Sequence, residues 1–154
     1  MYSKILGAFV AVSLLAACTS SDKETTSRTS SGSAASASTT GDPLSAGADK
    51  IFFDLDRSVI RDDARATLDT QAAWLNTNKT VNVQIAGACD ERGTEEYNIA
   101  LGNRRAFAAA TYLAAKGVAP SRVSTISYGK DRPIAPGSTE EAWAQNRNAI
   151  TSVR

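Results

Sequence analysis

Charged side chains gather in one short stretch of the chain, GACDERGTEEYN, which runs from Gly87 to Asn98. It holds four acids, one arginine and a cysteine, and it lies between a segment that alternates like a strand and one with helical periodicity. Carboxylates and a guanidinium group at such a turn could bind a charged ligand, hold a metal or take part in acid–base chemistry. The residue types elsewhere in the chain decide which of these three functions is possible.

Histidine is absent from the 154 residues, and the only cysteines are Cys18 and Cys89. Because histidine is the usual general base and the commonest zinc ligand, we expect no metal, no cofactor and no catalytic residue. Seventeen basic and sixteen acidic residues give a net charge of +1, without the basic surplus that is typical of nucleic-acid binders.

Asp90 and Arg105 are the candidates for binding a zwitterionic ligand. Asp90 follows the predicted strand, and Arg105 lies almost three turns into the predicted helix. Arginine offers a planar fork to a carboxylate, and aspartate accepts hydrogen bonds from an ammonium group. The alternative is an internal Asp90–Arg105 salt bridge that fixes the loop to the helix, and these residues alone leave both possibilities open.

The neighbours of Asp90 have structural explanations. Thr94 is a natural helix N-cap, and Gly93 permits a left-handed backbone before it. Glu95 and Glu96 fall in the first helical turn, where acids complement the helix dipole. Cys89 is expected to be a small buried side chain.

Hydrophobic periodicity predicts the elements that position these residues. Strands are expected at Lys50–Asp56, Thr80–Ala88, Arg122–Gly129 and Asn148–Arg154, and helices at Asp62–Asn78, from about Glu95 to Lys116, and within Pro136–Arg147. Asp62 or Asp63 is the expected N-cap of the first helix. The order βαβαβ(α)β predicts an α/β fold of the α+β sandwich type, with a mixed four-stranded sheet and helices on one face.

The N-terminus has the features of a lipoprotein signal peptide over residues 1–17. An apolar run from Ile5 to Ala17 is shorter than the roughly 20 residues that span a bilayer, and Leu15-Ala16-Ala17-Cys18 matches the bacterial lipobox. Cys18 is therefore expected to carry the lipid. Residues 18–48 are predicted to be a disordered tether of Ser, Thr, Ala and Gly, and residues 49–154 the folded domain.

GACDERGTEEYNIALGNRRA, with IFFDLD and ISYGKDRP in the same order, resembles the signature of the OmpA-like C-terminal domain family, and within it the peptidoglycan-associated lipoproteins (Pal). The resemblance covers about residues 50 to 154. It implies an OmpA-like βαβα(β)β domain that binds peptidoglycan through meso-diaminopimelate of the stem peptide. The side chain of that residue carries both an ammonium group and a carboxylate.

By resemblance, Asp90 is expected to bind the ammonium group and Arg105 the carboxylate. Further ligand contacts are implied for Asp56, Arg92, Thr94 and Leu101, and a loop-ordering role for Gly93 and Asn98. Arg104 projects about 100° away from Arg105 on the predicted helix, so it is expected to be a surface charge. The chain departs from the family pattern at Ala88, Val59 and Asn148. The family commonly has histidine or another polar residue at the position of Ala88, an acid at that of Val59 and an arginine at that of Asn148.

The resemblance implies a non-catalytic outer-membrane lipoprotein whose domain faces the periplasm and tethers the membrane to the wall. The fact that Thr19, and not an aspartate, follows the lipobox favours the outer membrane. TolB and other Tol proteins are the implied partners, in membrane integrity and constriction during cell division. Two alternatives stay open: an OmpA-like wall-binding lipoprotein outside the Tol system, and a wall hydrolase that uses Asp54, Asp56 and Asp90 as acid and base.

Overall fold

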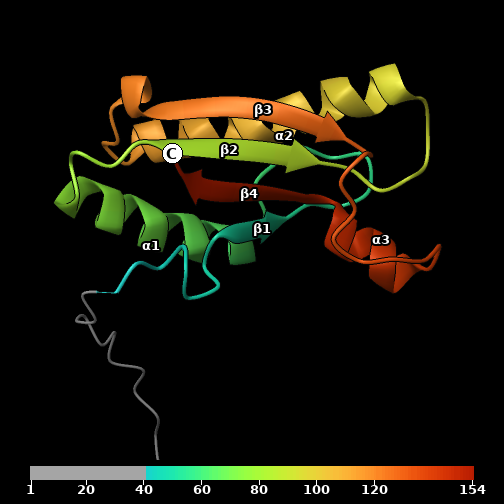
Figure 1. The fold of residues 1–154 in the computed structure, drawn as a ribbon, viewed down its shortest axis with the longest axis horizontal. Helices are drawn as coiled ribbons and strands as arrows, with labels where there is room; N and C mark the ends of the chain where they lie inside the picture. Colours follow the sequence, from blue (N-terminus) through green and yellow to red (C-terminus); the bar gives the residue numbers. More distant parts are fainter. Residues whose placement is uncertain (1–40) are drawn as a thin grey trace, which may run out of the picture. The chain divides into compact units, whose positions relative to one another are not determined.

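A computed structural model describes residues 41–154, which contain four strands, two long helices and one short helix (Figure 1). In chain order these are β1 (Lys50–Phe52), α1 (Asp62–Thr77), β2 (Val83–Ala88), α2 (Glu95–Ala115), β3 (Val123–Gly129), α3 (Glu140–Asn146) and β4 (Asn148–Val153), with a 3-10 turn at Pro120–Arg122. The predicted order of elements is confirmed. The predicted signal peptide, Cys18 and most of the predicted tether lie outside the described residues.

The strands form one mixed sheet in the order β1-β4-β2-β3. Strand β4 is antiparallel to both β1 and β2, whereas β2 and β3 are parallel. Helices α1 and α2 share one core with the sheet, and α3 lies by the end of the sheet where β4 begins (Figure 1). The mixed four-stranded sheet with its two long helices on one face was predicted correctly.

The core lies between this face of the sheet and the two long helices. Leu68 and Leu75 of α1 and Leu113 of α2 are fully buried, in one cluster with Val83 and Ile85 of β2. Val83 and Ile85 are two residues apart in a strand and so point to the same face. Each fully buried side chain of this kind contributes about 1.5–3 kcal/mol to folding. Among the helices of residues 41–154, none has the length and apolarity to cross a membrane.

Two glycines let α2 lie directly against the end of β2. A Cβ atom on Gly87 would stand 1.9 Å from the carbonyl oxygen of Gly102, and one on Gly102 would stand 2.2 Å from Oγ of Ser127. No side chain fits at either position. The close approach brings the loop after β2, which carries Asp90, next to the turn of α2 that carries Arg105.

Residues 42–48 make contacts with the folded part, which the sequence predicts to begin at residue 49. Leu44 is buried in the core cluster, and its N–H donates to the Asp42 carboxylate at 2.9 Å. Gln71 of α1 donates from Nε2 to the Ala48 carbonyl at 2.6 Å. A single leucine in a polar segment has no periodicity, so the sequence pattern gave no indication of this packing.

Strand β2 begins at Val83 and not at Thr80, and two more local predictions differ from the structure. Strand β1 ends at Phe52 and not at Asp56, because the chain turns out of the sheet and Asp56 adopts a positive φ of 56°. The N-cap of α1 is Arg61, whose side chain makes no capping hydrogen bond, and Asp62 and Asp63 lie in the first turn. Arg61 instead donates to the Asp63 carboxylate, from Nε at 3.1 Å and from Nη2 at 3.0 Å.

Candidate ligand-binding pocket

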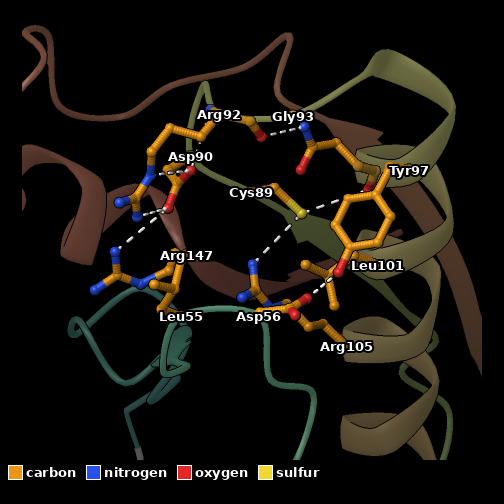
Figure 2. Close-up of a pocket in the computed structure, with 11 residues that line it drawn as sticks. Leu55, Asp56, Cys89, Asp90, Arg92, Gly93, Tyr97, Leu101, Arg105 and Arg147 are labelled. Atoms are coloured by element: carbon orange, nitrogen blue, oxygen red, sulfur yellow. Dashed lines mark hydrogen bonds and ion pairs between the residues drawn. The ribbon is translucent and has the colours of Figure 1, made fainter.

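A pocket of about 320 Å³ lies between the turn after β1, the loop after β2 and the N-terminal half of α2 (Figure 2). Its lining consists of Leu55, Asp56, Cys89, Asp90, Arg92, Gly93, Tyr97, Asn98, Leu101, Arg105 and Arg147. The structure thus brings together every predicted ligand contact except Thr94. The Thr94 hydroxyl caps α2 by accepting from the Tyr97 N–H at 3.2 Å, as expected for an N-cap.

Asp90 is 5% exposed and is surrounded by hydrogen-bond donors. Arg92 donates to its carboxylate from Nε at 3.1 Å, from Nη2 at 2.7 Å and from the backbone N–H at 3.2 Å, and Arg147 donates from Nη1 at 3.3 Å. Burial alone would raise the pKa of Asp90, but the hydrogen bonds from Arg92 and Arg147 lower it below its usual value. Asp90 is therefore charged, and its carboxylate already has four donors.

Arg105 is fully buried and joins α2 to the turn after β1. It donates from Nε to the Arg57 carbonyl at 2.9 Å, from Nη2 to the Asp54 carbonyl at 3.1 Å and from Nη1 to the Ala88 carbonyl at 2.8 Å. Its guanidinium carbon lies 5.2 Å from the centre of the Phe53 ring. Burial lowers the pKa of Arg105, yet an arginine keeps its charge at neutral pH.

The two candidate charges are not joined to each other. Asp90 pairs with Arg92 and Arg147, and those two arginines also face Glu140, at 3.9 Å and 2.7 Å. The two negative charges of Asp90 and Glu140 therefore balance the two positive charges of Arg92 and Arg147. Among the ion pairs of residues 41–154, none includes Asp56 or Arg105. These two are therefore the charged residues of the pocket that have no ion-pair partner.

Cys89 and Asn98 lie at the base of the loop. Cys89 is 3% exposed, as expected for a small buried side chain, and burial raises the pKa of its thiol. Its sulfur lies 3.4 Å from Nη1 of Arg105 and 3.4 Å from the Asn98 carbonyl oxygen. Asn98 donates from Nδ2 to the carbonyls of Arg92 at 2.8 Å and Thr94 at 3.0 Å. These contacts hold the loop in shape, and Gly93 within it has a φ of 90°.

The three residues that depart from the family pattern differ in their burial and in their contacts. Ala88 is buried, and its carbonyl receives the Arg105 hydrogen bond whatever its side chain is. Val59 is 68% exposed and does not line the pocket. Asn148 is fully buried: its Nδ2 donates to two backbone carbonyls, whereas its Oδ1 has no hydrogen-bond partner. The structure shows no role for that unpaired oxygen.

Sequence reasoning missed Arg147 and Tyr97 as residues that line the pocket. Arg147 is 57 residues from its partner Asp90, so no local spacing could connect them. Tyr97 did carry a signal, because Tyr97, Leu101 and Arg105 are four residues apart and share one face of α2. Arg104, the neighbour of Arg105, is exposed and lies 6.0 Å from the centre of the Tyr97 ring.

Known proteins resemble this chain in sequence. The OmpA family matches residues 52–147. The peptidoglycan-associated lipoprotein of Mesorhizobium japonicum is 55% identical over 105 residues, which are 68% of this chain and 62% of that protein. That alignment therefore spans about three-fifths of the relative's length. The peptidoglycan-associated lipoprotein of Pasteurella multocida is 40% identical over 148 residues, which are 96% of this chain and 95% of that protein.

Solved structures resemble its fold. The peptidoglycan-associated lipoprotein of Burkholderia pseudomallei superposes with a TM-score of 0.67 at 38% identity, over 69% of this chain and 90% of that one. The C-terminal domain of Helicobacter pylori MotB has a TM-score of 0.64 at 24% identity, over 69% and 84% of the two chains, a likeness of fold alone. With the family match over residues 52–147, these findings identify the chain as a member of the OmpA family.

Proposed function

We propose that this domain binds peptidoglycan non-covalently and is not an enzyme. The observation that supports this most directly is the pocket, where Asp56 and Arg105 present opposite charges that no ion pair within residues 41–154 balances. A ligand with both an ammonium group and a carboxylate complements such a pair. The names of the relatives, peptidoglycan-associated lipoprotein, support the class of ligand.

The proposed ligand group is the side chain of meso-diaminopimelate in the stem peptide. Arg105 has five N–H donors, and its hydrogen bonds in the structure use four of them, so one remains for the ligand carboxylate. Asp90 and Asp56 supply negative charge toward the ammonium group. Leu101, which is 5% exposed, lines the pocket and offers an apolar surface to the methylene groups of the ligand.

The hydrolase alternative fits the same residues poorly. A glycosidase needs a carboxylic acid with a raised pKa to protonate the leaving group. The pKa of Asp90 is lowered by Arg92 and Arg147, which outweigh its burial. Asp54 pairs with Arg61 at 3.3 Å and does not line the pocket. These contacts favour binding over hydrolysis.

Incubation of the purified protein with purified peptidoglycan of the diaminopimelate type tests the proposal. We expect the protein to pellet with the wall and to release no muropeptides. A protein that stays in the supernatant would contradict wall binding, and muropeptides in the supernatant would establish the hydrolase alternative.

We further propose that a lipid on Cys18 anchors the protein in the outer membrane with its domain in the periplasm. The lipobox supports this anchor, and several acyl chains, at about 0.8 kcal/mol per buried CH₂, would make it stable. Cys18→Ala should therefore move the protein from the membrane fraction to the soluble fraction without weakening wall binding. A variant that stays in the membrane fraction would contradict the lipid anchor.

Resemblance to the peptidoglycan-associated lipoproteins also supports a place in the Tol-Pal system, in outer-membrane integrity and constriction during division. Capture of purified TolB in the absence of wall is the expected result. If TolB is not captured, the protein is a wall-binding lipoprotein outside the Tol system.

A further inference from the structure

Tyr97 and Asp56 meet at the pocket, although they are 41 residues apart in the sequence. The Tyr97 hydroxyl donates a hydrogen bond to Oδ1 of Asp56, and the tyrosine ring extends from α2 toward the turn after β1 (Figure 2). Tyr97 is 44% exposed and does not belong to the hydrophobic core. Its contact with Asp56 therefore needs an explanation other than core packing.

The backbone at Asp56 is held in an unusual conformation. Within residues 41–154 it is the only residue other than glycine with a positive φ. This region costs roughly 1–2 kcal/mol for most residues, and aspartate enters it more readily than others. Arg57 closes the turn by donating to the Asp54 carbonyl at 3.2 Å, and Arg105 donates to the carbonyls at both ends of the turn. Strain that surrounding contacts hold in place often marks a functional position.

Asp56 differs from Asp90 in what its carboxylate already binds. Asp90 accepts four hydrogen bonds from Arg92 and Arg147, which is about the capacity of a carboxylate. Asp56 accepts the Tyr97 hydroxyl on Oδ1, and within residues 41–154 its Oδ2 accepts no hydrogen bond. Asp56 is therefore the acid of the pocket with an oxygen left for a cation.

We propose that Tyr97 is a positioning residue that makes the pocket selective for a ligand bearing an ammonium group, because its hydroxyl holds one oxygen of Asp56 and so orients the other. This inference rests on the proposed function. Without the hydroxyl, the exposed Asp56 side chain can rotate into solvent, and the ligand must then restrict it on binding. When the ligand itself must order one such side chain on binding, the lost rotational freedom weakens affinity by about five-fold.

Two soluble stem peptides separate this role from a general effect on the pocket. One ends in meso-diaminopimelate, and the other has 2-aminopimelate in its place, which keeps the side-chain carboxylate and lacks the ammonium group. Binding of both is measured by calorimetry for the purified full chain, Tyr97→Phe, Asp56→Asn and the double variant. Tyr112→Phe is the matched control, since Tyr112 also lies on α2 and donates to an aspartate, Asp69, at 3.0 Å, but it does not line the pocket.

For the diaminopimelate peptide we expect about five-fold weaker binding by Tyr97→Phe and ten-fold or more by Asp56→Asn. The double variant should bind no more weakly than Asp56→Asn, and Tyr112→Phe should bind like the original chain. Affinity for the aminopimelate peptide should not change in Tyr97→Phe.

Three results would overturn the inference while leaving the proposed function in place: unchanged binding by Tyr97→Phe, equal losses for both peptides, or losses that add in the double variant. Failure of the original chain to bind the diaminopimelate peptide would contradict the proposed function itself, and this inference with it.

Discussion

Replacing Asp90 with alanine should weaken wall binding by about 2–5 kcal/mol, roughly 30-fold to several thousand-fold. It should also lower the free energy of unfolding by about 3–5 kcal/mol, because the change breaks a buried ion pair by removing one partner. Arg92 and Arg147 would be left facing only Glu140, whose side chain is 61% exposed. The resulting positive charge beside the pocket repels the ligand ammonium.

Asp62→Ala is the matched control for this variant. Asp62 is also ion-paired with an arginine, Arg65, at 3.3 Å, but its side chain is 99% exposed, so its loss should change stability by less than about 1 kcal/mol. Pelleting with purified wall reports binding, and urea unfolding followed by circular dichroism reports stability. Undiminished pelleting of Asp90→Ala would show that Asp90 is not needed for binding.

The same ion pairs give stability a predicted pH dependence. The folded-state pKa of Asp90 lies below its unfolded value, which is about 3.9. Its contribution to stability is therefore complete above about pH 4 and is lost as the pH falls through the folded pKa. The difference in unfolding free energy between the original chain and Asp90→Asn should narrow between pH 7 and pH 3. A constant difference over that range would contradict the assigned ion pairs.

Arg105→Ala should weaken wall binding by a similar 2–5 kcal/mol. The change removes the positive charge proposed for the ligand carboxylate. It also removes the Arg105 hydrogen bonds to the carbonyls of Asp54, Arg57 and Ala88, of which the Asp54 carbonyl still accepts from the Arg57 N–H. Each buried carbonyl left unsatisfied costs about 1–3 kcal/mol, so the turn that carries Asp56 should also loosen.

Arg104→Ala and Arg105→Lys are the comparisons for this variant. Arg104 is exposed, and its loss should leave binding within about two-fold of the original. Lysine at position 105 keeps the charge, but it lacks the planar fork that reaches three carbonyls, and so it should restore binding only in part. If Arg104→Ala weakened pelleting as much as Arg105→Ala, the assigned orientation of the two arginines would be wrong.

The elements of this fold follow from local signals, and so their order was predictable. Alternation marks Val83 and Ile85 on one face of β2, and Thr94 with the glycine before it marks the start of α2. The segment from Asp54 to Asp56 was taken for strand because it continues an apolar run. The contacts that bend it out of the sheet come from Arg105, which lies about fifty residues further along the chain.

The site was predictable where its residues share a short stretch, and not where distant segments meet. Asp90, Arg92, Leu101 and Arg105 lie close together in the sequence and line one pocket. The arginine that completes the surroundings of Asp90 is the C-cap of α3 and directly precedes β4, the strand that sheet topology places beside β2. Which acid retains an oxygen for a ligand depends on such tertiary contacts, and residue spacing does not encode them.

Pelleting with two walls side by side tests the central claim most directly. One wall contains meso-diaminopimelate, and the other contains lysine, which keeps the side-chain ammonium group but lacks the carboxylate proposed for Arg105. We predict that the protein pellets with the diaminopimelate wall and at least ten-fold less strongly with the lysine wall, since a charge-assisted pair is lost. Equal pelleting with both walls, or none with the diaminopimelate wall, would contradict recognition of a zwitterion by this pocket.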